Sequence, residues 1–192
     1  MIKKAATTGA NWLCVNGVVD CSKDKIYAYG LELLLSGVVN VLCVLLLSFV
    51  FFRLSSGLFF LLAFIPLRST AGGYHANSHW GCNLVFLTTF ICAQSIADIF
   101  FGQYTVTVYL VVAVVSFVTL LLLSPCEAGN KALTSERRAR NRHRSLLLGG
   151  ANLIITIVLL IVGRINLWAT SYYLGVFATS LSMWATQIMK RM

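Results

Sequence analysis

Long, nearly uninterrupted apolar blocks dominate the sequence and leave little chain for anything else. Six of them cover residues 31–52, 54–67, 84–101, 106–123, 146–163 and 165–189. A helix of ~20 apolar residues, rising about 1.5 Å per residue, crosses ~30 Å of hydrocarbon. The alternation of period two that a transmembrane barrel requires is absent from these blocks. We therefore predict an all-α, polytopic membrane bundle of about six transmembrane helices, forming a single membrane domain over residues 1–192.

The composition agrees with this prediction and excludes a soluble protein. Hydrophobic residues make up 58% of the chain and charged residues only 11%, whereas a soluble domain carries about 25% charged residues. The residues outside the blocks are too few and too scattered for a soluble domain of ~100 residues.

The placement of basic residues predicts the orientation. A net charge of +9 would suit a nucleic-acid-binding protein, but the basic residues lie between the apolar blocks. If the N-terminus is cytoplasmic and all six blocks cross, all but Arg53 and Arg164 of the 15 Lys and Arg residues face the cytoplasm. This asymmetry follows the positive-inside rule. We expect both termini in the cytoplasm and no nucleic-acid partner.

The first 25 residues contain no unbroken apolar core of the kind found in signal peptides. We read residues 1–25 as an amphipathic segment lying in the membrane interface.

The six cysteines include no CxxC pair, and in the predicted topology they lie in the reducing cytoplasm or inside spans. We therefore expect no disulfide framework. The cysteines are Cys14, Cys21, Cys43, Cys82, Cys92 and Cys126.

A polar segment follows the short second block. Residues 54–67 give only about 21 Å of helix, so the bilayer must thin, the turn at Arg53 must sink, or the segment that follows must begin below the membrane surface. Residues 68–82 bring together an arginine, three glycines, a cysteine and two of the three histidines. We predict a cytoplasmic catalytic loop over residues 68–82 and a basic cytoplasmic loop over residues 125–145.

Three interpretations of the polar segment follow from its residues alone. Cys82 could be a nucleophile activated by His75 or His79, with backbone N–H groups of Gly72 and Gly73 stabilising an oxyanion. His75, His79 and Cys82 also stand at helical spacing for a metal, although no fourth ligand is near and the glycines disfavour a helix. A plain polar turn is the third interpretation. We predict neither a metal nor a cofactor.

The run from Arg68 to Ala76, followed by Cys82 seven residues after His75, resembles the signature of the accessory gene regulator B (AgrB) family of bacterial membrane endopeptidases. Residues 29–32 and 124–131 also agree with that family's pattern, so the resemblance extends over about residues 20–145.

The resemblance implies a cysteine endopeptidase of the bacterial cell membrane that acts in quorum sensing. Its substrate would be an AgrD-type precursor peptide, cut at the cytoplasmic leaflet. Cys82 would be the nucleophile and His75 the general base, whereas His79 is not part of the pattern. The resulting thioester would be passed to ring closure of a thiolactone or lactone autoinducing peptide. The family resemblance also suggests a homodimer.

Arg68 and the basic residues of the second loop each have two possible roles. Arg68 is expected to fix a substrate carboxylate or to anchor the segment at the interface. Lys131, Arg137 and Arg138 would orient the acidic tail of the precursor, although anchoring to anionic lipid also explains basic residues here. Several residues could complete a catalytic triad and none is preferred: Ser69, Asn77, Asn83 and Glu127.

A small transporter or exporter subunit without peptidase activity is the alternative. Asp98 and the polar segment would then line a path across the membrane. Transporters usually carry internal repeats and paired broken helices, and the sequence displays neither.

Overall fold

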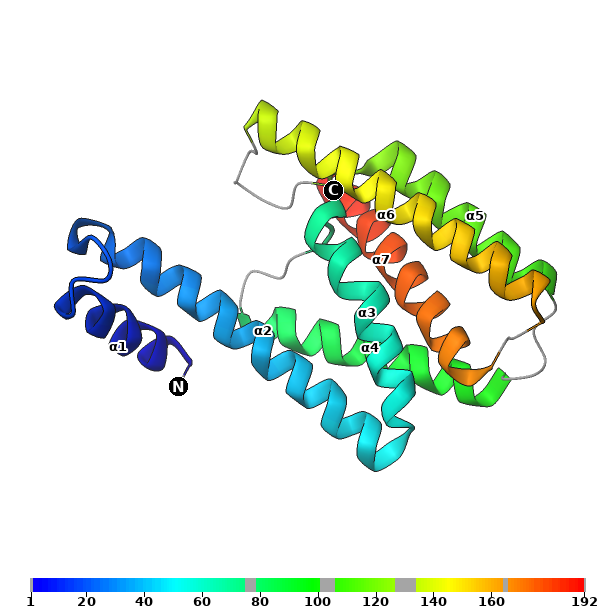
Figure 1. Ribbon diagram of the computed structural model, residues 1–192, viewed down its shortest axis with the longest axis horizontal. Coiled ribbons are helices and arrows are strands. Elements are labelled where there is room, and N and C mark those ends of the chain that lie inside the picture. The colour runs from blue at the N-terminus through cyan, green and yellow to red at the C-terminus, as the bar shows by residue number, and fades with distance from the viewer. Residues whose placement is uncertain (1, 75–78, 101–105, 127–133, 164–165, 192) are drawn as a thin grey trace. The chain divides into compact units, whose positions relative to one another are not determined.

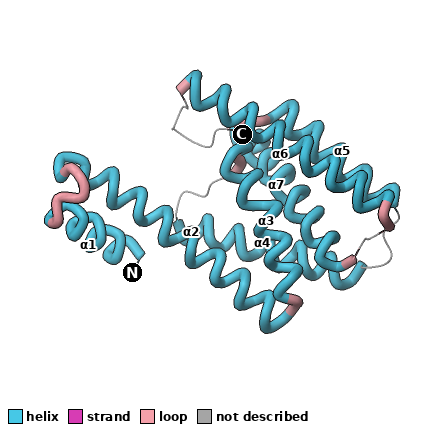
Figure 2. The backbone as a smooth tube through the Cα atoms, in the orientation of Figure 1, coloured by secondary structure: helices cyan, strands magenta, loops and turns pink. Residues whose placement is uncertain are grey.

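The computed structural model describes the chain except for residues 1, 75–78, 101–105, 127–133, 164–165 and 192. Its described residues form α-helices and one short 3-10 helix, and no strand is present among them (Figures 1 and 2). The all-α prediction is confirmed. The elements are α1 (Ile2–Val15), η1 (Cys21–Lys23), α2 (Asp24–Phe51), α3 (Leu54–Ala71), α4 (His79–Phe100), α5 (Val106–Leu123), α6 (Ser135–Ile161) and α7 (Leu167–Arg191).

Five stretches of described helix are long and apolar enough to cross a membrane: Cys21–Phe51, Leu54–Ala71, Trp80–Ile99, Val106–Leu123 and Ser135–Ile161. They match the first five apolar blocks of the sequence. The sixth block forms α7, which is long but not among the five. Its Ser and Thr residues lower the hydropathy, and several of their side chains, including Thr170, Ser171 and Thr179, are buried in the bundle.

Helix ends account for the main differences from the predicted boundaries. Helix α3 continues to Ala71 and α4 begins at His79, so both ends of the predicted catalytic loop are helical. Helix α6 begins at Ser135, inside the predicted basic loop. The arginines of this segment favour helix as much as apolar residues do, because their unbranched side chains lose little freedom there.

The chain divides into two compact units, residues Met1–Leu46 and Leu47–Met192. In the first unit, α1 lies along the beginning of α2 (Figure 1). Gly9 permits the close approach, because a Cβ atom there would lie 2.6 Å from Cδ2 of Leu31. Ala6 and Ala10 are buried on the same face of α1.

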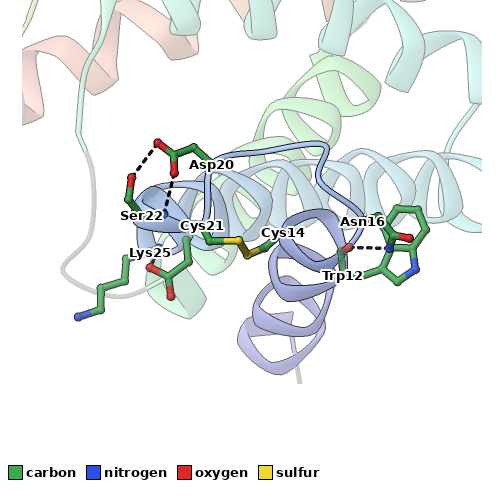
Figure 3. Close-up of a disulfide and its surroundings, with 8 residues drawn as sticks. Trp12, Cys14, Asn16, Asp20, Cys21, Ser22 and Lys25 are labelled. Atoms are coloured by element: carbon green, nitrogen blue, oxygen red, sulfur yellow. Dashed lines mark hydrogen bonds between the residues drawn. A yellow bond between two sulfur atoms is a disulfide. The ribbon is translucent and has the colours of Figure 1, made fainter.

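A disulfide between Cys14 and Cys21 joins the end of α1 to η1 (Figure 3). The expectation that these cysteines are unpaired is therefore wrong. The intervening turn brings the two Cα atoms to 5.2 Å, helped by Gly17 at a φ of 68°. Asp20 begins η1 by accepting hydrogen bonds from Ser22, at 3.0 Å from the N–H and 2.8 Å from the hydroxyl.

In the second unit, α7 lies between α3 and the paired helices α5 and α6 (Figure 1). Small residues allow this packing. At Gly175, an added Cβ atom would lie 2.9 Å from the carbonyl oxygen of Phe60 on α3. Close approach through small residues is the usual basis of helix association in membranes.

Polar side chains hold α7 in register with its neighbours. The hydroxyl of Ser171 donates to the side-chain oxygen of Gln94 on α4 at 2.9 Å. Nearer the C-terminal end, the indole N–H of Trp184 donates to the hydroxyl of Thr119 on α5 at 3.2 Å. These bonds tie α7 to α4 and α5.

Candidate active site

The glycine pair after α3 forms a pinned turn. Gly72 ends the helix at a φ of 78° and donates its N–H to the carbonyl of Arg68 at 3.2 Å. Gly73 follows at a φ of 131°, and its N–H donates to the carbonyl of Cys126 at 3.3 Å. Both φ values lie where glycine is strongly favoured. Because both N–H groups bond within the chain, neither is available to an oxyanion in this conformation.

Cys126 pairs with this turn although it follows a different helix, α5. Its N–H donates to the carbonyl of Ala71 at 2.7 Å, and together with the bond from Gly73 this makes a parallel bridge between Gly72 and Cys126. The Cys126 side chain is buried, with its thiol 3.9 Å from the carbonyl of Met183 on α7. The segment after α5 thus supports the turn after α3.

Tyr74 is the last described residue before His75, and both its backbone N–H and its backbone carbonyl are hydrogen-bonded. Its N–H donates to the carbonyl of Ser182 on α7 at 3.1 Å. Its carbonyl accepts a hydrogen bond from Nη2 of Arg68. Residues of α3 and α7 therefore fix the backbone of Tyr74, just before residues 75–78.

Arg68 occupies the centre of this arrangement. Its half-buried guanidinium interacts electrostatically with the sulfur atoms of Cys82 and Cys126. Its Nη1 atom is buried and has no hydrogen-bond partner among the described residues. A positive charge held in this way is suited to stabilise negative charge that develops in a reaction.

Cys82 lies in the first turn of α4. It is half-buried and takes no part in a disulfide. The first turn of a helix favours negative charge, because its backbone N–H groups are not all used within the helix. The helix start and Arg68 thus place two sources of positive potential near the thiol.

Of the two histidines in the polar segment, only His79 lies among the described residues. His75 lies outside the described residues, and so does Lys131 of the expected substrate-binding set. His79 is the first residue of α4. No group of three His, Cys, Asp or Glu side chains suited to a metal occurs in the described part of the chain. The zinc interpretation depended on His75 and stays untested.

Three of the five arginines of α6 differ in their surroundings and fall into two groups. Arg137 and Arg138 are exposed in the first turn of the helix, as a substrate-binding role would require. Arg142 reaches back to the end of α5, where it donates to the carbonyl oxygens of Ser124 and Leu121, each at 3.4 Å. Sequence reasoning did not separate these two groups.

Cys126 and Ser182 were also missed as parts of the site. The segment around Cys126 carries part of the family pattern, which was a usable signal for it. Ser182 stands in no motif, and only the fold brings it to Gly73.

The chain matches the family model of accessory gene regulator B over residues 6–188. It belongs to the AgrB family. The match includes every residue of the glycine turn, Arg68, Cys82 and the first turns of α6. No curated protein and no solved structure matches this AgrB-family chain.

Proposed function

We propose that this AgrB-family protein is a membrane-embedded cysteine endopeptidase that removes the C-terminal tail of an AgrD-type precursor peptide. Cys82 is the nucleophile and His75 the general base. The observation that carries the proposal is the setting of Cys82. Its thiol lies at the start of α4 and interacts with the same Arg68 guanidinium that holds Tyr74, the residue before His75.

The chemistry begins with transfer of the Cys82 thiol proton to His75 as the sulfur attacks the scissile carbonyl carbon. The carbonyl electrons move onto oxygen, giving a tetrahedral oxyanion. Its collapse restores the carbonyl and breaks the C–N bond, and His75 returns the proton to the leaving amine. The signal portion stays on Cys82 as a thioester. A thiol or hydroxyl of the precursor then displaces the Cys82 sulfur and closes the thiolactone or lactone ring.

The glycine turn and Arg68 act as positioning groups in this scheme. Gly72 and Gly73 allow the chain before His75 to lie against Cys126 and α7, where larger residues would collide. Arg68 holds the carbonyl of Tyr74. These contacts fix the backbone of Tyr74, the residue before the general base, and a general base must be positioned precisely.

The beginning of α6 supplies the substrate-binding surface. Arg137 and Arg138 are exposed there, and with Lys131 they attract the acidic tail of the precursor through complementary charge. The active-site segment and both termini face the cytoplasm of the bacterial cell, where the positive-inside rule locates these basic residues. Two copies of the chain form the working homodimer.

The test is mass spectrometry of the full-length protein in liposomes, incubated with a synthetic AgrD-type precursor that has an amphipathic N-terminal helix, an internal Cys and an acidic C-terminal tail. Wild-type protein and Cys92→Ala are expected to give a released tail and a thioester adduct. Cys92 is a matched control because it is a free cysteine on the same helix as Cys82.

Cys82→Ala and His75→Ala are expected to abolish both products, whereas His79→Ala keeps them. Cleavage that survives Cys82→Ala would contradict the mechanism. Transport of the peptide by Cys82→Ala without any cleavage in wild type would favour the exporter alternative.

A further inference from the structure

Two buried polar atoms from different helices meet at Gly73. A Cβ atom on Gly73 would lie 2.6 Å from Nη1 of Arg68 and would collide with Oγ of Ser182. Both atoms are buried, and neither has a hydrogen-bond partner in the described part of the chain. The ends of α3 and α7 therefore bring a guanidinium N–H and a hydroxyl group to one place.

Unpaired donors in such a position need an explanation. A buried polar group without a partner costs free energy relative to the same group in water. Native proteins keep few of them, and a catalytic role is one of the reasons for which such a group persists. Arg68 and Ser182 also lie at the site already described, since Arg68 interacts electrostatically with Cys82.

The proposed mechanism needs hydrogen-bond donors for its oxyanion, and the two glycine N–H groups do not supply them in this conformation. The tetrahedral intermediate carries a negative oxygen that must accept hydrogen bonds. The N–H groups of Gly72 and Gly73 already donate to Arg68 and Cys126 carbonyls. Among the described side chains next to this turn, Nη1 of Arg68 and Oγ of Ser182 are buried donors without a partner.

We infer that Arg68 and Ser182 form the oxyanion hole of this enzyme, with Ser182 of α7 as a further catalytic residue. Nη1 and the Ser182 hydroxyl both donate to the oxygen of the scissile carbonyl once Cys82 has attacked it. The guanidinium balances its negative charge, and the hydroxyl adds a neutral donor. This inference rests on the proposed function.

The hydroxyl of Ser182 can be removed without disturbing the anchor that Ser182 also provides. The bond to Tyr74 uses the main-chain carbonyl of Ser182, which Ser182→Ala retains. Ser180 gives a matched control on the same helix, because its buried hydroxyl donates to the carbonyl of Val176 at 3.4 Å within α7.

Two reagents separate oxyanion stabilisation from reactivity of the thiol. An aryl thioester acylates Cys82 through a tetrahedral oxyanion, with a new S–C bond formed and the aryl thiol expelled. Iodoacetamide alkylates the same sulfur by direct displacement of iodide, with no oxyanion. The full-length protein in liposomes is treated with each reagent, and the rate of adduct formation at Cys82 is followed by mass spectrometry of its peptide.

Ser182→Ala is expected to slow acylation by about 10²–10³-fold, the usual effect of deleting one oxyanion donor, and to leave alkylation unchanged. Its melting temperature should not fall, because the deleted hydroxyl makes no bond. Ser180→Ala should react like wild type with both reagents.

Unchanged acylation in Ser182→Ala would overturn the inference. An equal loss of acylation and alkylation would also overturn it, since Ser182 would then act on the fold or on the thiol. Failure of the proposed function looks different. In that case the wild-type protein is alkylated at Cys82 but is not acylated there at all.

Discussion

Gly72 and Cys126 form a parallel bridge, with the N–H of Cys126 2.7 Å from the carbonyl of Ala71 and the N–H of Gly73 3.3 Å from the carbonyl of Cys126. This bridge joins the end of α3 to the segment after α5, two parts of the chain that are distant in sequence. Because Gly72 immediately precedes Gly73 and Tyr74, any change that opens the bridge also moves the chain that leads to His75.

Gly72→Ala is expected to destabilise the protein and abolish cleavage. A Cβ atom at this position would collide with the carbonyl oxygen of Cys126, and the φ of 78° is unfavourable for alanine. The backbone conformation alone should cost about 1–3 kcal/mol. Thermal unfolding in detergent and the precursor cleavage assay measure the two effects.

Gly150→Ala serves as its control. Gly150 lies within α6, and a Cβ atom there would have no neighbour within 4 Å. Alanine favours helix over glycine by about 1 kcal/mol, so this variant should keep full activity and unfold at the same or a higher temperature. Equal losses in the two glycine variants would refute the role given to the Gly72–Cys126 bridge.

Cys126→Ala is expected to keep most of the cleavage activity. The bridge uses the main chain of Cys126, which alanine retains, and the hydrogen bond of the buried thiol to the carbonyl of Met183 is long, at 3.9 Å. The variant should therefore still form the thioester adduct at Cys82 in the mass-spectrometric assay. A loss of adduct as complete as that of Cys82→Ala would show that Cys126 is itself a reacting thiol.

The positions of most helices could be predicted because membrane helices are determined by local hydropathy. The block at residues 106–123 coincides with α5, and the others lie within the observed helices or overrun them by a few residues. Helix α7 shows where this reasoning weakens. The hydroxyl groups of Thr170 and Ser171 bond to side chains of other helices, so the stability of α7 as a helix in the bundle does not follow from hydropathy alone.

The site was predictable only as far as its motif extends. The motif residues stand close together in sequence: Arg68, Gly72, Gly73 and Cys82. In the structure, Arg68 lies against Gly73 and donates a hydrogen bond to the carbonyl of Tyr74. Cys126 and Ser182 come from the ends of α5 and α7, so their contribution depends on how those helices pack. The Cys14–Cys21 disulfide likewise depends on a turn whose geometry the spacing of the cysteines does not reveal.

The disulfide between Cys14 and Cys21 predicts a specific thiol count. In the absence of a reductant, neither cysteine should react with a maleimide in the denatured protein, and both should react after reduction. The mass of the unreduced chain should be lower by two hydrogen atoms. Cys92, which is exposed and free, should react in both samples. Maleimide adducts on Cys14 and Cys21 without reduction would rule out the bond and restore the expectation of free thiols.

Arg142→Ala and Arg137→Ala, one variant from each group of arginines in α6, should differ in their effects on melting temperature and KM. Arg142 donates to the carbonyl oxygens of Ser124 and Leu121 at the end of α5. Its loss should cost about 1 kcal/mol and lower the melting temperature by about 2–4 °C. Arg137 is exposed at the start of the helix, so its loss should leave the melting temperature unchanged but raise the KM for a precursor with an acidic tail. Because that effect is electrostatic between exposed groups, it should shrink as salt is added. A salt-independent KM, or a melting temperature lowered equally in both variants, would contradict this division of roles.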